Sequence, residues 1–255
     1  MISSSSRPVR SLPRRSTYRI RRATTPADLD AAQRLRFAVF NIELQEGLAA
    51  SHAIGRDVDA YDAFCDHLLV ESEETGEIVG TYRLQTGQLA AANLGYYSEQ
   101  EFDFSPYEGL RCEVVELGRA CVHREHRHVG VLGLLWRGIV VYARERRARY
   151  LIGCSSLNSQ DAAIGAATLT YFQGAGMMVE EALLTRPTPA FTCALDTVAS
   201  PCPPPPKLLR SYLAVGARIC GAPAIDREFG TIDFLTLLDL TRLSDSAAAH
   251  FGLHE

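Results

Sequence analysis

The chain has 255 residues, of which 47% are hydrophobic and 22% charged, and its formal net charge is −4 at pH 7. These values are typical of a globular protein with a sizeable core, and no apolar run approaches the roughly 20 residues of a membrane-spanning helix. The seven cysteines form no C-x-x-C pair, and the Ser- and Arg-rich N-terminus has no apolar signal region. The sequence therefore predicts a cytoplasmic protein with neither a disulfide framework nor a zinc site.

Charge is distributed unevenly along the chain. Residues 1–22 contain seven arginines and no acid, residues 43–77 contain ten acids and one arginine, and residues 123–149 contain seven arginines and two acids. Such alternation indicates a face or cleft that sorts a cationic small molecule from an anionic partner. Charges that only decorate solvated faces explain the pattern equally well.

The first elements follow an N-terminal tail. Residues 1–16 are rich in Ser, Arg and Pro and are predicted to be a disordered basic tail, with contact to an anionic membrane as the alternative. We expect one domain over residues 17–255, beginning with a strand at 18–22. Thr25 and Pro26 are typical of a helix start, and this helix is predicted to reach about Phe40. Arg36 falls in its apolar stripe and needs a buried anionic partner.

The remaining elements alternate between strands and helices. Residues 73–76 are a hairpin turn, and residues 87–112 are predicted to be loop with short helical pieces. Strands are predicted at 67–71, 77–85, 113–123, 150–156 and 231–240, and helices at 131–149, 162–172 and 207–215. The order predicts an α/β (α+β) fold with a mixed central sheet flanked by helices.

The strand at 113–123 carries the first candidate for chemistry. Alternation along a strand places Glu116 and Arg119 on opposite faces, so they share a site only if a bulge intervenes. Gly118 is where a bulge is best tolerated, and a bulge frees a backbone N–H for a developing oxyanion. An ordinary ion pair at a strand end is the alternative interpretation.

Two loops are further candidates. The turn before the helix at 131–149 lies where a phosphate-binding loop would lie, but it has Gly130 alone where such loops usually have two glycines. The loop at 57–62 carries three aspartates without the glycine and closing glutamate of a calcium loop, so no metal is predicted. A lid that recognises a cation and a solvated acidic loop are both consistent with it.

Several separated motifs share one resemblance. They are Arg36-x-x-x-Phe40-x-x-Glu43-Leu44, Asp59-x-x-Asp62, Glu116-Leu117-Gly118-Arg119 and the segments 65–70, 80–84, 95–103, 208–213 and 226–234. Together they resemble the hemolysin-like branch of the GNAT fold and, within it, the L-ornithine Nα-acyltransferases. The pattern is also similar to that of the acyl-homoserine-lactone synthases. The resemblance spans about residues 18–252.

The resemblance implies a reaction and its partners. These enzymes move a 3-hydroxyacyl group from acyl carrier protein to the α-amine of ornithine, which gives lyso-ornithine lipid. No cofactor or metal is implied beyond the phosphopantetheine thioester of the carrier protein, and no nucleic acid. Glu116 and Arg119 are implied as the catalytic residues, with Glu116 as the base, directly or through water. The alternatives are an autoinducer-type or other N-acyl-amino-acid synthase, and a non-catalytic module that binds carrier protein or membrane.

The remaining site residues are assigned to two ligands. The acidic loop is expected to hold the cationic side chain of the substrate, and Arg83 and Arg119 to fix the acids of that loop or the substrate carboxylate. The substrate-binding residues are expected to be Arg36, Phe40, Glu43, Asp59, Asp62 and Arg83. The residues expected to bind carrier protein and its phosphopantetheine are Arg124, Arg127, Gly130 and Arg137. Leu132, in place of a second loop glycine, favours a phosphopantetheine arm over the pyrophosphate of CoA.

Overall fold

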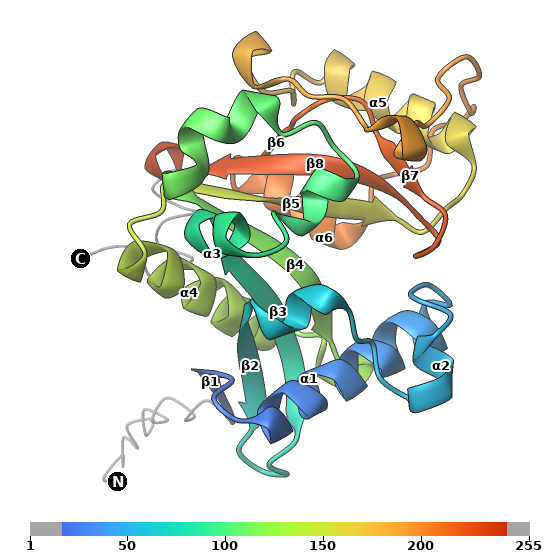
Figure 1. Cartoon of the computed structure of the whole chain (residues 1–255). Coiled ribbons are helices and arrows are strands. Elements are labelled where there is room, and N and C mark those ends of the chain that lie inside the picture. The colour runs from blue at the N-terminus through green and yellow to red at the C-terminus, as the bar shows by residue number, and fades with distance from the viewer. Residues whose placement is uncertain (1–16, 244–255) are drawn as a thin grey trace, which may run out of the picture.

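The structure, a computed structural model, describes residues 17–243 (Figure 1). The predicted tail at 1–16 and the end of the predicted domain at 244–255 lie outside these residues. One mixed sheet runs through the described part, in the order β1-β2-β3-β4-β5-β8-β6, with β7 paired to β8. Its strands are β1 (Tyr18–Arg22), β2 (Asp66–Ser72), β3 (Ile78–Thr86), β4 (Val114–Val122), β5 (Tyr150–Leu157), β6 (Arg218–Ile219), β7 (Ala224–Asp226) and β8 (Thr231–Asp239). Within this part of the chain only β4 and β5 pair in parallel, which confirms the predicted mixed sheet.

Helices cover both faces of the sheet. They are α1 (Pro26–Phe37), α2 (Ser51–Ile54), α3 (Gly87–Ala92), α4 (Val129–Glu145), α5 (Ala162–Gly174) and α6 (Lys207–Ala214). Helix α4 packs on the face of β3 that carries Tyr82 and Leu84. Because side chains alternate along a strand, Arg83 points to the opposite face, where it joins Arg36 of α1 around one carboxylate. The two helices therefore lie on opposite sides of the first four strands.

The predicted boundaries differ from the structure at several element ends, and α4 ends at Glu145 instead of residue 149. The Thr25 hydroxyl caps α1 as expected, by accepting a hydrogen bond from the Asp28 N–H, but α1 ends at Phe37. A π-helix at Ala38–Glu43 follows and carries Phe40. Strands β6 and β7 were not predicted, because two or three residues are too few for alternation to show.

The sheet divides at the boundary between β4 and β5. Their parallel register covers only Val114–Glu116 against Tyr150–Ile152, whereas β5 pairs with β8 along its whole length. At the last point of contact a Cβ on Gly153 would lie 2.2 Å from the Leu117 carbonyl oxygen, so only glycine permits this approach. Beyond it the half with β1–β4 and the half with β5–β8 diverge (Figure 1).

Among residues 17–243, no helix is both long and apolar enough to cross a membrane.

Candidate active site

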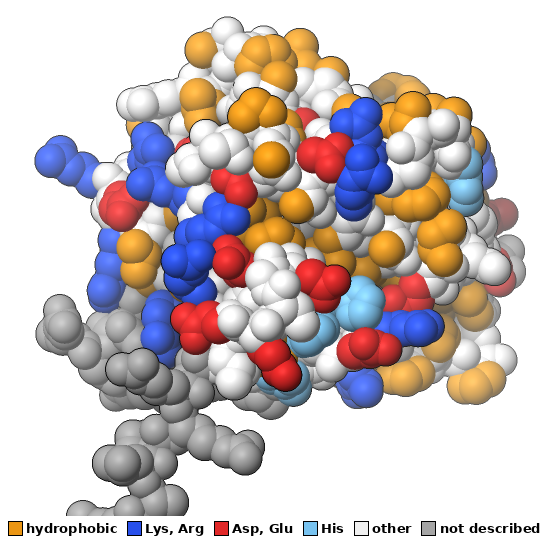
Figure 2. All heavy atoms as spheres, turned by 90° about the horizontal axis from the view of Figure 1, so that it is seen from below, with side chains coloured by type: hydrophobic (Ala, Val, Ile, Leu, Met, Phe, Trp, Pro, Cys, Tyr) orange, Lys and Arg blue, Asp and Glu red, His pale blue; other side chains and the backbone are white. Residues whose placement is uncertain are grey.

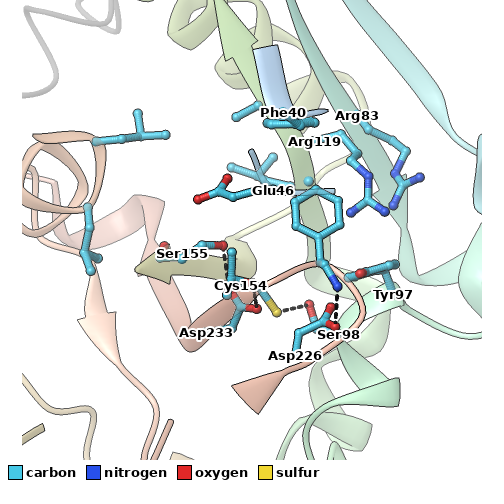
Figure 3. Close-up of a pocket in the computed structure, with 18 of the residues that line it drawn as sticks. Phe40, Glu46, Arg83, Tyr97, Ser98, Arg119, Cys154, Ser155, Asp226 and Asp233 are labelled. Atoms are coloured by element: carbon cyan, nitrogen blue, oxygen red, sulfur yellow. Dashed lines mark hydrogen bonds between the residues drawn. The ribbon is translucent and has the colours of Figure 1, made fainter. Parts of the chain in front are cut away.

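A cavity of about 320 Å³ opens where β4 and β5 diverge. Its lining comes from both halves of the sheet and from the segments that precede β2 and β4. In the close-up, Arg83 and Arg119 lie side by side, and Asp226 and Asp233 lie apart from them at the β7–β8 hairpin (Figure 3). Cationic and anionic side chains therefore line separate parts of the cavity.

Strand β4 carries a bulge beside this cavity. Thr81 pairs with Cys121 and Arg83 with Gly118, so Tyr82 alone faces two residues of β4. The extra residue is at Arg119–Ala120, one position after the predicted Gly118, and Arg119 has a left-handed φ of 49°. This conformation costs a non-glycine residue about 1 kcal/mol or more. The bulge brings Arg119 to the same cavity as Glu116, which regular alternation would prevent.

Glu116 is anchored by hydrogen bonds from one short segment. Oε1 accepts from the Ser98 N–H at 2.8 Å and the Ser98 hydroxyl at 2.6 Å, and Oε2 accepts from the Tyr97 N–H at 2.9 Å. Burial raises the pKa of the Glu116 carboxyl, while these hydrogen bonds and the charge of Arg83 oppose the rise. Such a carboxylate has a defined orientation and an elevated basicity, which are the properties of a general base.

Three arginines and three aspartates form a buried network, called here the Arg–Asp network. Its members are Arg36, Arg83, Arg119, Asp57, Asp59 and Asp62. Arg36 is 0% exposed and contacts Asp57 at 2.7 Å and Asp62 at 2.6 Å, so it has the anionic partner that its place in α1 requires. Burial acts to raise the pKa of Asp62, but the hydrogen bond and charge of Arg36 hold it well below its ordinary range.

The network corrects one sequence-based expectation. Asp59 and Asp62 were expected to hold the cationic side chain of the substrate, but their carboxylates are bound by Arg83, Arg119 and Arg36. The three positive and three negative charges balance, so the loop offers no net negative charge to a ligand. Instead, Arg83 and Arg119 fix the acids of this loop, which is one of the two roles that the resemblance implied for them.

Aromatic rings hold Arg119 in place. Its guanidinium carbon lies 4.7 Å from the centre of the Tyr97 ring and 4.7 Å from that of Phe229. The Phe229 ring in turn contacts Phe40, which lines the cavity as expected. Stacking of this kind stabilises a buried guanidinium, so these rings help to hold Arg119 in the wall of the cavity.

The structure also assembles an acidic group that sequence reasoning missed. Carboxylate oxygens of Glu101, Asp226 and Asp233 lie within 4.8 Å of one another, and all three residues are buried. Asp226 and Asp233 line the cavity with Glu101, and so does Glu46. The available signal was Asp233, an acid between the apolar residues Ile232 and Phe234 of strand β8. Glu101 and Asp226 lie in the segments 95–103 and 226–234, which supported the resemblance without an assigned role.

A smaller apolar cavity continues from the first. The two share Tyr82, Leu117, Cys154, Ser155 and Tyr212, and the smaller one reaches Trp136 of α4 and Leu238 of β8. The Tyr82 and Tyr212 hydroxyls are 2.5 Å apart, which satisfies two polar groups at an apolar wall. A small and mostly apolar recess therefore adjoins the charged cavity.

Comparison with known proteins identifies the family. The acetyltransferase (GNAT) domain family matches residues 35–137. The L-ornithine Nα-acyltransferase of Brucella abortus is 32% identical over 268 aligned positions, which cover 94% of this chain and 91% of that protein. The enzyme of the same name from Agrobacterium fabrum is 31% identical, with coverage of 92% and 85%.

The chain belongs to the L-ornithine Nα-acyltransferase family. It is therefore an acyltransferase with a GNAT domain, as the motifs indicated. Among solved structures, FeeM, an N-acyl amino acid synthase from uncultured soil microbes, has a TM-score of 0.53, 12% identity and coverage of 89% and 93%. The AHL synthase LasI has a TM-score of 0.51, 12% identity and coverage of 90% and 92%. At these identities the two structures establish the fold alone.

In this member of the L-ornithine Nα-acyltransferase family, two predicted residues pair with each other. Arg127 Nη1 and Nη2 lie 2.5 and 2.8 Å from the two carboxylate oxygens of Glu43, and Nε donates to the Val122 carbonyl at 2.9 Å. Neither residue lines the cavity. The structure therefore does not place Glu43 with the substrate residues. The ion pair of Arg127 with Glu43 joins the turn before α4 to the π-helix that follows α1.

The other residues assigned to carrier protein lie at the surface. Arg124 and Arg137 are exposed, and Gly130 lies in the first turn of α4, whose N-cap residue His128 makes no side-chain cap. Helix N-termini of this kind have backbone N–H groups without partners in the helix. On the face in Figure 2, arginine side chains lie next to acidic ones rather than in one basic field. Binding of phosphopantetheine here stays a prediction.

Proposed function

We propose that the protein transfers a fatty acyl group from acyl carrier protein to the α-amine of ornithine, the first step of ornithine lipid synthesis. The names of the relatives supply the acceptor and the N-acyl chemistry. Buried Glu116 carries the proposal for this chain, because its carboxylate lines the charged cavity and is held there by Ser98 and Tyr97.

The proposed reaction proceeds by direct attack. Glu116, directly or through a water, removes a proton from the α-ammonium of ornithine, and the neutral amine attacks the thioester carbonyl. The new C–N bond forms a tetrahedral intermediate whose nitrogen carries one proton more than the amide product. The intermediate collapses as the C–S bond breaks, and this proton passes to the leaving sulfur, so the donor departs as a thiol. Beyond Glu116 the backbone of β4 faces the cavity instead of β5, so an N–H of this stretch is the proposed oxyanion donor.

A covalent intermediate on the chain is not part of this scheme. Cys154 lines the cavity, but burial and the nearby carboxylate of Glu101 raise the pKa of its thiol well above the ordinary value. A thiol in these surroundings is a poor nucleophile. The donor arrives already activated as a thioester, so the proposed reaction requires neither a metal nor a resident cofactor.

Product analysis tests the proposal. Purified protein is incubated with 3-hydroxyacyl carrier protein and a panel of amino acids, and products are identified by mass spectrometry; we expect N-acyl-ornithine as the main product. Parallel reactions with the same acyl group on CoA test the choice of donor. Formation of a homoserine lactone from S-adenosylmethionine would support the autoinducer alternative instead. No product from any acceptor with either donor would sink the proposal and favour a binding module.

The proposed carrier surface has its own test. Arg124→Glu removes an exposed positive charge in the turn before α4, and Arg137→Glu removes one at the middle of this helix. With acyl carrier protein as donor we expect KM to rise, because carrier proteins are acidic and exposed charges steer association. With acyl-CoA the effect should be smaller. Equal effects on both donors would contradict a carrier-specific surface.

A further inference from the structure

The acidic group in the cavity is chemically incomplete. Glu101 is 1% exposed, lines the cavity, and neither of its carboxylate oxygens has a hydrogen-bond partner among the described residues. Carboxylate oxygens of Asp226 and Asp233 lie within 4.8 Å of it. Buried acids without partners are costly, and their free energy falls when a cation or a donor group arrives. The arrangement is that of a binding site for a cation.

Among the described residues no ion pair joins an arginine or lysine to Glu101, Asp226 or Asp233, and Arg119 acts on Glu101 only through its charge at a distance. The arginines that line the cavity, Arg83 and Arg119, are bound to Asp59, and the Arg–Asp network is balanced at three charges of each sign. The ring of Phe229 packs against the Arg119 guanidinium on the side of this hairpin. The negative charge around Glu101 is therefore left for a ligand.

We propose that Glu101, Asp226 and Asp233 bind the side-chain ammonium group of the acceptor amino acid. The inference rests on the proposed function and assigns the part of the site that selects ornithine among amino acids. In this proposal the acidic group, and not the loop at 57–62, holds the cationic side chain of the substrate, because arginines do not neutralise the acidic group. The two segments that carry it, 95–103 and 226–234, meet at the cavity although they are distant in the sequence.

The donors already present favour an ammonium over a metal ion. Among the described residues, Asp226 Oδ1 accepts from the Glu228 and Phe229 N–H groups, and Asp233 accepts from the hydroxyls of Ser156 and Thr231. This leaves both oxygens of Glu101 and Oδ2 of Asp226 to accept from the three N–H donors of an ammonium group, while the nearby Asp233 carboxylate contributes through its charge. A divalent ion such as Ca²⁺ or Mg²⁺ takes six or more oxygen ligands.

The position of Glu101 relative to the base Glu116 suits a substrate with two amino groups. Ser98 donates to Glu116, and Cys154 Sγ donates to the Ser98 hydroxyl at 3.4 Å. Glu101 follows three residues after Ser98, in the same short segment. One segment therefore holds the base at one end and the free carboxylate at the other. An amino acid that places its α-amine at Glu116 can direct a charged side chain to Glu101.

Proton binding at the site responds to such a ligand. Burial, Asp233 and Asp226 raise the pKa of Glu101 well above its ordinary range, while Cys154 and Arg119 oppose the rise. Burial likewise raises the pKa of Asp233 to about 6. A bound ammonium stabilises the ionised carboxylates, so ornithine binding near pH 6 should release protons. Calorimetry in buffers of different ionisation enthalpy measures this release.

The test compares ornithine with norvaline, which has the same carbon chain without the δ-amine. For Glu101→Gln we expect the ornithine-to-norvaline ratio of kcat/KM to fall about ten- to hundredfold, the value of a charged hydrogen bond. Asp226→Asn keeps the carbonyl that accepts from the turn N–H groups and should act in the same direction. The matched control is Glu228→Gln, which changes the same charge at an exposed position in the same turn and should leave the ratio unchanged.

The outcomes separate this inference from the proposed function. If wild type makes acyl-ornithine and both variants keep the wild-type ratio, the site is wrong and the function stands. A preference for ornithine that disappears with EDTA and returns with Mg²⁺ or Ca²⁺ overturns the inference in favour of a metal site. If no acyl product forms at all, calorimetric binding of ornithine to wild type, absent with norvaline and with Glu101→Gln, still supports the site.

Discussion

The Ser98 hydroxyl donates a 2.6 Å hydrogen bond to Oε1 of Glu116, and the Ser98 N–H reaches the same oxygen at 2.8 Å. Two donors from one residue fix the plane of the carboxylate, and the Tyr97 N–H holds the other oxygen. Each of these bonds favours the charged form, against the effect of burial. The base is therefore oriented and tuned by the segment before β4 rather than by the strand that carries it.

Glu116→Gln should keep the fold and lose most of the activity. The amide is nearly isosteric but cannot take a proton from the α-ammonium, so we expect kcat to fall about 10²- to 10⁴-fold. Single-turnover acyl transfer measures this, with far-UV circular dichroism as the folding control. Unchanged turnover would rule out the role of Glu116 as base.

Ser98→Ala tests the tuning of that base. Ser98 lowers the pKa of Glu116, so its loss should raise that pKa, and more of the base will be protonated at a given pH. The acidic limb of the kcat/KM profile should therefore move to higher pH. At high pH, where Glu116 is ionised in both proteins, kcat/KM of the variant should fall less than it does on the acidic limb. A uniform loss of activity at all pH values, with no shift of the limb, would mean that Ser98 is only structural.

The sequence predicts those helices and strands that neighbouring residues mark. The family motifs imply the substrates of the reaction. The cap at Thr25 and the long helix α4 follow from neighbouring residues, and both are present. The buried position of Arg36 follows from helical periodicity, but its choice of Asp57 and Asp62 depends on how the loop folds back. Local pattern cannot supply that information.

The charged groups of the cavity show the same limit more clearly. Glu101 and Asp233 come together only because the segment before β4 meets the β7–β8 hairpin across the divided sheet. Glu43 and Arg127, which the sequence assigned to different ligands, pair across 84 residues. Alternation requires a bulge between Glu116 and Arg119, yet its position at Arg119–Ala120 depends on the β3 register.

Arg36→Met should destabilise the protein strongly. It leaves the carboxylates of Asp57 and Asp62 buried without their main partner, which costs about 3–5 kcal/mol of unfolding free energy. Arg34→Met is the matched control two residues away, because its ion pair with Asp30 is exposed and contributes about 0–1 kcal/mol. Urea unfolding measures both. Equal effects would contradict the buried network.

Stability should fall as the pH rises from 4.5 to 8. Burial, with Asp233 nearby, raises the pKa of Glu46 to about 7 from 4.5, and burial raises that of Asp233 to about 6 from 3.8. The folded state thus binds protons more tightly than the unfolded chain, so this contribution is complete below about pH 4 and is lost through pH 6–7. Glu46→Gln should flatten the dependence of the unfolding free energy on pH, and Glu228→Gln should not. A parallel pH profile for Glu46→Gln and wild type would contradict the prediction.

Gly153→Ala should disrupt the site through the backbone. The new Cβ would lie 2.2 Å from the Leu117 carbonyl oxygen, where β4 and β5 last touch, and neither backbone can yield without shifting its strand. We expect a loss of about 1–3 kcal/mol of unfolding free energy. The acyl-transfer rate should fall further than this loss of stability explains, because Glu116 lies one residue before Leu117. Gly133→Ala on α4 is the control: its Cβ would meet nothing within 4 Å, so it should be neutral or slightly stabilising. If Gly153→Ala keeps full activity and stability, close approach of β4 and β5 is not what holds the cavity in shape.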